Sequence, residues 1–575
     1  MYGFEPDVWR EVKRRWEVSR RRSAALGLVH RFGHDESGVA AVVLGILFTV
    51  VLFMAALAID DTRYTSEWMQ DRYALDAALL AASHTMGQPD QDEAARARAE
   101  AFYVANRSDG SARDLAKITI DDNNGTIAGT TRFDWSATLL KALGYDKVQL
   151  GSGASVERGK SAEVVMVLDN SSSMQGTPLY ELQEAAQKLT ETLFVGKGNS
   201  DRSVKVGVVP FASSVNVGPN NKNQDWIDSR GLSPLHRENY QNYSGSGASS
   251  LTRFDLFERL GTSWGGCVEA RTGDYELNDT LADAENPATL FVPMFAPDEP
   301  DDANNPDAQN GNADGFFYNS YIDDNPTPSC PVQEVVCTQT SKRGNCTKSS
   351  VTPLPPAQAQ RQICKYDGVQ SPTTTTFTFK QGGPTMRKGP NFGCEAVPLL
   401  PLTNSREAVE AKLYDMVAMG GANISEGVMW GHRVLSPGSP FMEGASFEDK
   451  QTRKFMVLLA RGANFIEAFR DSIPNHSIYS TWGFGASDRL NPQSHTDSAL
   501  TNAMNSKSRE ACRLVSDAGV KLYTIGFGVS DAHTRSMLQY CASHPSMNFD
   551  VTKGDELLQV FERIGREISE LRVSG

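Results

Sequence analysis

The stretch Glu163-Val-Val-Met-Val-Leu-Asp169-Asn-Ser-Ser-Ser-Met174 indicates how the larger part of this chain folds. Its first seven residues form a short, nearly continuous apolar run, which is typical of a strand buried on both faces of a parallel sheet. Asp169, Ser171 and Ser173 then alternate along a loop that leads into a predicted helix. A carboxylate and two hydroxyls make an oxygen-only ligand set that suits a hard cation such as Mg²⁺. The same residue types also cap helix N-termini, so a purely structural role stays open here.

Strands and helices alternate on both sides of this stretch. Residues 178–194 are predicted to form an amphipathic helix and residues 204–211 a second buried strand, which together predict a βαβ unit. We therefore predict an α/β fold with a doubly wound, Rossmann-like sheet, whose ligands bind at the carboxyl ends of the strands. After residue 400 the pattern predicts further helices at 405–435, 506–518, 532–541 and 555–571, and strands at 454–459 and 520–527.

A long polar segment, residues 219–394, interrupts this alternation and is rich in Asn, Asp, Pro, Ser, Gly and Thr. A structureless loop of this length is improbable inside a domain, so we expect a Cys-containing insertion with some order of its own. Cys512 and Cys541 lie outside it, and we expect them to form a disulfide. The insertion holds the other six cysteines, whose spacing matches no zinc pattern and does not reveal their pairing: Cys267, Cys330, Cys337, Cys346, Cys364 and Cys394.

Residues 38–59 form an apolar run without a charged side chain. As a helix, 22 residues extend about 33 Å, enough to cross a hydrocarbon core of about 30 Å. A buried core helix and a cleaved signal peptide are alternatives, but the run is longer than a usual signal-peptide core, and we favour an uncleaved anchor. Residues 1–37 carry a net charge of +2, against −16 for the rest of the chain. The positive flank predicts a cytoplasmic N-terminus with the bulk of the chain outside the cytoplasm.

The residues after the anchor predict a small α+β stalk domain at 60–158. Residues 62–87 and 91–106 have helical patterns, and β-branched residues gather within 117–157. The net charge of the whole chain, −14, makes it a poor candidate for binding nucleic acid. The predicted organisation is a cytoplasmic tail (1–37), a transmembrane helix (38–59), the stalk (60–158), a split α/β domain (159–218 and 395–575) and the insertion (219–394).

The motif Asp169-x-Ser171-x-Ser173 after a buried strand resembles the metal-ion-dependent adhesion site (MIDAS) of von Willebrand factor type A (VWA) domains. The order of elements is similar over about 162–217 and 395–571. This resemblance implies a Mg²⁺ site at the carboxyl edge of the sheet. It also implies protein binding and cell adhesion, with a partner carboxylate that completes the coordination of the metal.

Two positions depart from that family pattern. The family's Gly-Gly-Thr-Asn stretch is Gly420-Gly421-Ala422-Asn423 here, and its Thr-Asp-Gly is Ala460-Arg461-Gly462. A guanidinium about 5 Å from a dication costs several kcal/mol even at an effective dielectric near 20. We therefore expect the site not to hold Mg²⁺ tightly, and we take Ala422, Asn423 and Arg461 as candidates for the binding edge. Either Arg461 pairs with Asp169 in place of the metal, or it points into solvent.

The N-terminal part has a resemblance of its own. Residues 35–40, the apolar run, Ile59-Asp60 and the alanine-rich 75–82 are similar to TadG-like Flp pilus-assembly proteins, over about residues 35–85. Three segments that begin at Trp264, Ala296 and Gly427 also resemble that group. The resemblance implies a bacterial inner-membrane protein that is periplasmic or extracellular beyond its anchor.

We therefore expect a membrane-anchored envelope protein of the Flp/Tad pilus assembly type. It would act by protein–protein binding through its VWA domain, and its partners would be other pilus or envelope proteins. A surface adhesin that is displayed or released is an alternative, and a metal-dependent enzyme or chaperone-like factor is a third. No catalytic constellation is visible, so we expect neither enzyme activity nor a small-molecule substrate.

Overall fold

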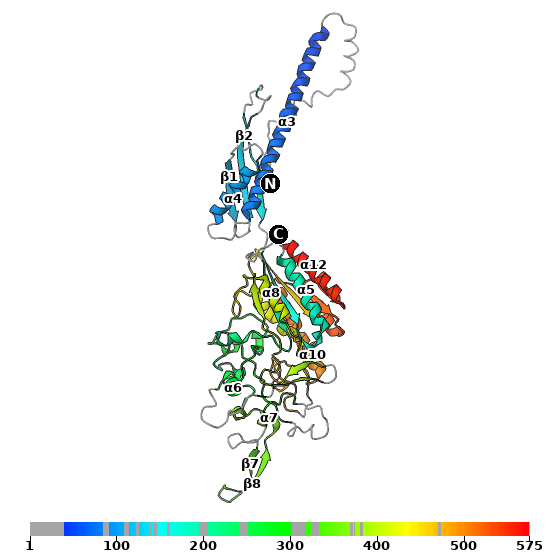
Figure 1. Ribbon diagram of the computed structural model, residues 1–575. Helices are drawn as coiled ribbons and strands as arrows, with labels where there is room; N and C mark the ends of the chain where they lie inside the picture. Colours follow the sequence, from blue (N-terminus) through cyan, green and yellow to red (C-terminus); the bar gives the residue numbers. More distant parts are fainter. Residues whose placement is uncertain are drawn as a thin grey trace. The chain divides into compact units, whose positions relative to one another are not determined.

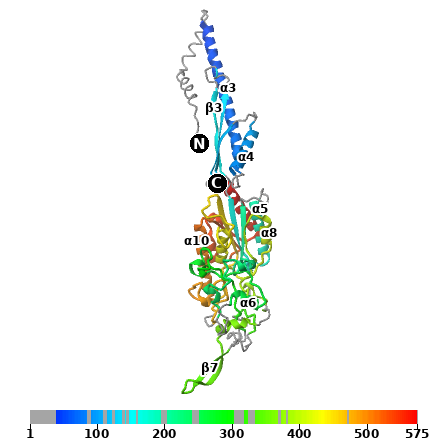
Figure 2. The same ribbon diagram turned by 90° about the vertical axis from the view of Figure 1, so that its left-hand side faces the viewer.

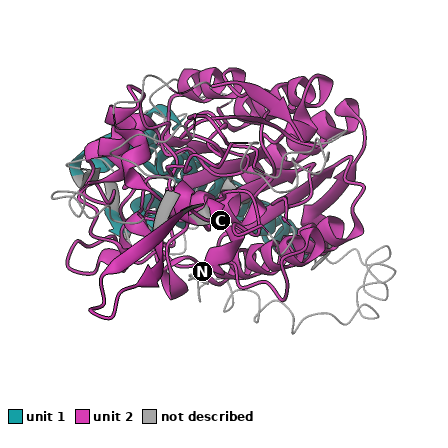
Figure 3. Ribbon diagram, turned by 90° about the horizontal axis from the view of Figure 1, so that it is seen from below, with its two compact units in different colours: residues 1–159, 575 teal, residues 160–574 magenta. Residues whose placement is uncertain are grey.

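The computed structural model describes two compact units (Figure 3). Along the chain, the boundary between them lies between Gly159 and Lys160. The predicted domain boundaries stay a prediction. The cytoplasmic tail predicted at 1–37 lies outside the described residues. The described residues are 39–83, 91–107, 114–121, 126–136, 141, 147–157, 161–194, 204–240, 251–301, 317–323, 333–367, 372, 374–379, 383–469 and 473–573.

Unit 1 begins with one continuous helix, α3 (Val39–Ser83). The part of the helix from Ala41 to Ser83 is long enough, and contains a stretch apolar enough, to cross a membrane. Side chains of the first half are exposed, as with Leu44 and Phe48, because they have no protein to pack against. The helix predicted to follow the anchor is therefore present as far as Ser83, and residues 84–87 of that prediction lie outside the described residues.

The second half of α3 packs on a helix and an antiparallel sheet. Leu75, Ala78 and Leu79 are fully buried against α4 (Gln91–Ala105) and the sheet. The carboxylate of Asp71 joins the layers, since it accepts hydrogen bonds from Tyr103 on α4, Arg107 just beyond it and Thr131 on the sheet. The strands are β1 (Asp114–Asp121), β2 (Thr126–Ser136), β3 (Lys147–Leu150) and β4 (Gly153–Glu157).

Unit 2 is built on a six-stranded sheet in the order β11-β6-β5-β12-β13-β14. Five strands are parallel, and β11 pairs antiparallel at one edge. The central strand β5 is the predicted run at 163–169, and it is buried on both faces. The strands are β5 (Ser161–Asp169), β6 (Val204–Phe211), β11 (Leu400–Thr403), β12 (Thr452–Ala460), β13 (Lys521–Phe527) and β14 (Asn548–Val551).

Helices cover both faces of this sheet, as a doubly wound fold requires (Figure 1). Val164 and Met166 of β5 point into one core with α5, α8 and α12, while Val165 and Val167 point into the other core with α9, α10 and α11. The α/β prediction is therefore confirmed. The helices are α5 (Thr177–Phe194), α8 (Arg406–Tyr414), α9 (Ile424–Leu435), α10 (Asp497–Asp517), α11 (Ala532–Cys541) and α12 (Gly554–Val573).

The segment 219–394 shares a hydrophobic core with the sheet. Trp226, Phe291 and Trp430 of α9 lie in one cluster, and every residue of α9 is buried. One hairpin of the segment projects away from the rest of unit 2 (Figure 2). The elements in the segment are α6 (Arg253–Arg259), β7 (Gln333–Thr340), β8 (Cys346–Pro353), α7 (Pro356–Gln360), β9 (Thr376–Thr378) and β10 (Thr385–Arg387).

Disulfides connect both distant and neighbouring segments of unit 2. Cys512 on α10 and Cys541 on α11 form the bond predicted from the sequence. Two further bonds join Cys267 to Cys394 and Cys337 to Cys346. Cys364 is also disulfide-bonded, and Cys330 lies outside the described residues. Bonds of this kind form and persist in oxidising compartments outside the cytoplasm.

Two adjacent carboxyl groups, Asp298 and Glu299, are buried within the segment 219–394. Burial raises the pKa of Glu299 to about 7, although Asn319 and Asn475 donate hydrogen bonds to its carboxyl group. Burial likewise raises the pKa of Asp298 to about 6, although Lys365 forms an ion pair with it. Both carboxyl groups therefore hold a proton more readily in the folded protein than in the unfolded chain.

We expect the contribution of Glu299 to the stability of unit 2 to fall as the pH rises. A folded-state pKa above the unfolded value gives stability that is complete below about pH 4 and is lost as the pH passes about 7. For Glu299 this amounts to about 3 kcal/mol. Glu299→Gln should therefore flatten the fall of the denaturation midpoint between about pH 5 and about pH 8, measured by thermal melts of the full chain. The matched control is Glu258→Gln at an exposed position on α6, and an unchanged slope in Glu299→Gln would contradict the assignment.

Candidate functional site

The carboxylate of Asp169 lies at the carboxyl end of β5 and is fully buried. Its Oδ1 accepts a hydrogen bond from the backbone N–H of Ser171 at 2.8 Å. Its Oδ2 accepts two more, from the backbone N–H groups of Arg461 at 2.8 Å and Gly462 at 3.0 Å. One carboxylate therefore joins the loop after β5 to the loop after β12, and both of its oxygens have protein donors.

The two predicted hydroxyl ligands lie side by side in the loop after Asp169. The Oγ atoms of Ser171 and Ser173 are 2.8 Å apart and share a hydrogen bond. Ser171 precedes the short 3-10 helix η2 (Ser172–Met174), but its side chain does not cap that helix. Ser171 is almost fully buried, whereas Ser173 is exposed. The hydroxyls therefore do not fill the capping role left open by the sequence.

Ala422 and Asn423 occupy different positions relative to these hydroxyls. A Cβ atom added to Gly462 would lie 3.4 Å from Cβ of Ala422 and 3.1 Å from the Oγ atoms of both serines. Ala422 therefore belongs to the cluster, although it offers a methyl group in place of a hydroxyl. Asn423 is buried, and its side chain caps α9 and donates hydrogen bonds to Ser213 and Thr481. It thus lies behind the edge and is not available there to a partner.

Arg461 does not pair with Asp169 through its side chain, so that expectation is wrong. Its Nε donates to the backbone oxygen of Ser173 at 2.9 Å, and its Nη1 donates to the backbone oxygen of Phe527 at 3.1 Å. The guanidinium also lies 5.2 Å from the centre of the Phe527 ring. The physical reason is that three backbone N–H groups already bind the carboxylate, while two carbonyl oxygens and an aromatic face are free to hold the side chain.

The alternative, that Arg461 points freely into solvent, does not describe the structure either. The side chain is half-buried and held at two points, and Nη2 has no hydrogen-bond partner among the described residues. Gly528 leaves room for it, since a Cβ atom there would lie 2.5 Å from Nη1 of Arg461. A positive φ of 62° at Gly528 favours glycine for a second reason.

The residues at this edge do not fit Mg²⁺. The oxygen ligands are one carboxylate, already bound by three N–H groups, and two hydroxyls, and no group of three or more His, Cys, Asp or Glu side chains gathers in the described part of the chain. The guanidinium of Arg461 is fixed to the backbone of Ser173, whose hydroxyl would be a ligand. A dication there would meet a fixed positive charge and only one negative one.

Large exposed side chains lie on α5 and in the loop after α8, and this loop reaches the edge where Asn170 donates to the backbone oxygen of Val417. Tyr180, Tyr414 and Val417 expose 66%, 78% and 47% of their surface. Gln183 on α5 donates to the backbone oxygens of Leu413 and Tyr414, which holds the loop after α8 against α5. Exposed apolar groups beside a fixed cation are features of protein-binding surfaces.

Sequence reasoning missed Phe527, Gly528 and the loop that contains Val417. A signal for the first two was present, because the strand predicted at 520–527 ends there and parallel strands end at the same edge of a sheet. The position of Val417 follows from the contact between α5 and the loop after α8, and no pattern in the sequence shows this contact.

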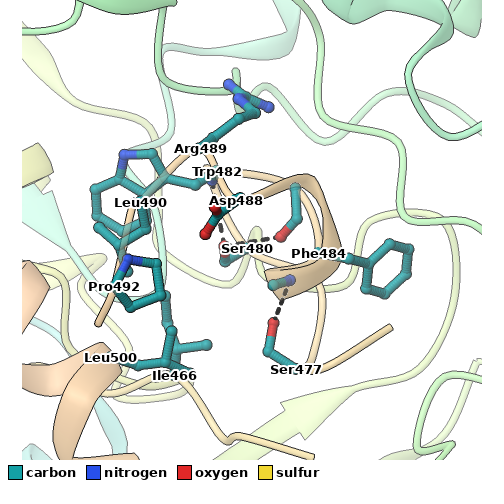
Figure 4. A pocket seen from close by; sticks show the side chains of 12 residues that line it. Ile466, Ser477, Ser480, Trp482, Phe484, Asp488, Arg489, Leu490, Pro492 and Leu500 are labelled. Atoms are coloured by element: carbon teal, nitrogen blue, oxygen red, sulfur yellow. Dashed lines mark hydrogen bonds between the residues drawn. The ribbon is translucent and has the colours of Figure 1, made fainter. Parts of the chain in front are cut away.

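A small cavity lies in the segment after β12, between Ile466, Trp482 and Leu490 (Figure 4). The hydroxyl of Ser477 donates to the backbone oxygen of Ile478, and the hydroxyl of Ser480 donates to the backbone oxygen of Gly483. The cavity volume is about 10 Å³, which is room for one water molecule at most. It therefore offers no space for a substrate.

No protein-family model matches the sequence, and no curated protein matches it. Among solved structures, the chain is similar to the vWF domain of the type V pili tip protein Mfa5 from Porphyromonas gingivalis, with 9% identity, a TM-score of 0.31, and 72% of this chain and 96% of that chain covered. It is also similar to the pilus adhesin SpaC from Lactobacillus rhamnosus GG, with 11% identity, a TM-score of 0.29, and 78% and 34% covered.

The pilus adhesin RrgA from Streptococcus pneumoniae is similar at 10% identity and a TM-score of 0.30, with 79% of this chain and 49% of that chain covered. This chain thus spans about a third of SpaC and about half of RrgA. Similarity at this level establishes neither fold nor function by itself, and the topology described above rests on the strand pairing of this chain.

We expect the full chain to melt at the same temperature, within about 1 °C, with and without millimolar Mg²⁺ or Mn²⁺. Ala422→Thr combined with Arg461→Asp restores a hydroxyl and a carboxylate, so this double variant should gain a metal-induced rise of several degrees, since each kcal/mol of binding raises the melting temperature by about 2–4 °C. Thermal melts in a neutral detergent, with Ca²⁺-free and EDTA-treated samples as references, make the comparison. A clear metal-induced rise in the wild-type protein would contradict the misfit.

Proposed function

We propose that this chain is a membrane-anchored envelope protein of the Flp/Tad pilus assembly type that binds a protein partner at the carboxyl edge of the unit 2 sheet. Binding there needs no metal ion, because Arg461 receives the partner's carboxylate directly. The protein is not an enzyme in this proposal. Its partners are other pilus or envelope proteins.

The observation that carries the proposal is the fixed guanidinium of Arg461 beside the hydroxyl of Ser173. Two hydrogen bonds orient the guanidinium, so little side-chain entropy is lost when a ligand arrives. Nη2 has no hydrogen-bond partner among the described residues, and a guanidinium binds a carboxylate well. The exposed Val417 supplies apolar contact area at the same edge, where its backbone oxygen accepts a hydrogen bond from Asn170. The combination suits an acidic side chain next to an apolar one on the partner.

The assignment to pilus assembly is supported by the N-terminal part of the chain. Residues 35–85 resemble TadG-like proteins, and α3 is one unbroken helix from an apolar first half to an alanine-rich second half. We infer that 38–59 is the anchor, that the N-terminus is cytoplasmic, and that both units lie in the periplasm or beyond. The disulfides agree with that location.

A surface adhesin is the second candidate, and one observation favours it. The hairpin β7–β8 projects from unit 2, its described side chains are largely exposed, and the Cys337–Cys346 disulfide holds it together. An isolated two-stranded hairpin is marginal in water, so the bond stabilises an arm that could contact a target surface. Fractionation distinguishes the candidates, because an assembly component stays at full length in the inner membrane.

Deletion of the gene in the source bacterium should abolish surface pili, counted by electron microscopy, and the wild-type gene should restore them. Arg461→Glu reverses the charge at the proposed contact, so it should restore few or no pili although the protein reaches the inner membrane at the wild-type level. We also expect neighbouring genes to encode a Flp pilin and its secretion ATPase.

The matched control is Arg513→Glu, which makes the same charge change on an exposed part of α10, at the other end of the sheet. It should restore pili fully. Full piliation by Arg461→Glu would contradict the proposed contact. Normal piliation in the deletion strain, together with a shed form of the protein, would favour the adhesin.

A further inference from the structure

A second recess lies at the opposite edge of the unit 2 sheet, at the amino ends of β12 and β13. Its volume is about 470 Å³, within the range of about 300–1,000 Å³ that is usual for small-molecule sites. Lys450, Arg453 and Lys521 line it, together with Phe447 and Asp449. Because parallel strands run between the two edges, this recess is separate from Arg461 and its neighbours.

The lining of this recess is cationic in a chain whose net charge is −14. Lys450 and Lys521 are exposed and Arg453 is half-buried, and none of the three forms an ion pair with a described residue. Lys454 also lines the recess, but its charge is matched by Glu163. The single carboxylate of the lining, Asp449, cannot neutralise three unpaired cations.

These cations are not needed to complete the end of α10, the structural role that competes with a ligand. The last carbonyl groups of that helix already accept backbone hydrogen bonds from Ala518, Gly519 and Val520. In the described part of the chain, no lysine or arginine side chain of the recess donates to them. The cations therefore line an open space without a protein partner among the described residues.

We propose that this recess binds a phosphate ester. Arginine and lysine side chains that line one recess suit an oxyanion with several acceptor oxygens. The volume exceeds that of a bare phosphate group, so the organic part of an ester also has room. The ester comes from an anionic lipid headgroup or from a soluble phosphorylated molecule, and both share this chemistry. The ligand is bound and not converted.

Calorimetric titration of the full chain in a neutral detergent tests the proposal. The probes are glycerol 3-phosphate and short-chain phosphatidylglycerol, with short-chain phosphatidylcholine as the zwitterionic reference. Arg453→Gln combined with Lys521→Gln should weaken binding roughly tenfold or more, because two charge-assisted contacts are lost. Lys450→Gln, at an exposed position, tests the same site with little risk to the fold, and higher salt should weaken binding in the wild-type protein.

The matched control variant is Lys188→Gln combined with Arg563→Gln, which removes two cations on α5 and α12, away from the recess lining, and should bind like the wild type. Binding of glycerol 3-phosphate alone would identify a soluble source, and binding of phosphatidylglycerol alone a lipid source; either supports the site. The proposal would be overturned if neither probe binds, or if the Arg453 and Lys450 variants bind the probes as tightly as the wild type does. It would also be overturned if phosphatidylcholine binds as tightly as phosphatidylglycerol. None of these results bears on partner binding at Arg461.

Discussion

The carboxylate of Asp169 is the contact on which the functional edge of unit 2 depends. It ends the central strand and accepts hydrogen bonds from the backbone of its own loop and of the loop after β12. A buried carboxylate without such donors would be costly, so the loops are held where their N–H groups point at it. That backbone arrangement places the side chain of Arg461 outward, where Ser173 and Phe527 hold it. A cation thereby stands fixed at the carboxyl edge of the sheet.

The unit 2 sheet was predictable because its strands are buried on both faces and therefore read as continuous apolar runs. The run at 163–169 and the later one at 454–459 both lie within central strands. The short edge strands β11 and β14 were not predictable in this way, since four residues carry no period. Nor did composition reveal that the polar segment 219–394 shares a core with α9, because scattered aromatic residues make that contact.

The sequence predicted which loops meet at the candidate site, but not which contacts their side chains make there. Adjacent parallel strands end at one edge, which brings Asp169 and Arg461 together from opposite parts of the sequence. Opposite charge favours an ion pair between their side chains. The structure has none, because the backbone N–H groups of Arg461 and Gly462 already donate to the carboxylate of Asp169. The direction of an arginine side chain depends on which carbonyl oxygens and rings lie near it. Phe527 and Gly528 decide it here, and neither belongs to the motif.

The two edges of the unit 2 sheet carry different features. The carboxyl edge has the oriented guanidinium of Arg461, and the amino edge has the recess lined by Lys450, Arg453 and Lys521. Partner binding without a metal is tested most directly by co-purification of the protein with its cross-linked neighbours from native membranes, in parallel samples that contain EDTA or Mg²⁺. We predict the same partner at the same yield in both samples, and its loss when Arg461 is changed to glutamate. Recovery of the partner in Mg²⁺ but not in EDTA would contradict a contact made by Arg461 alone.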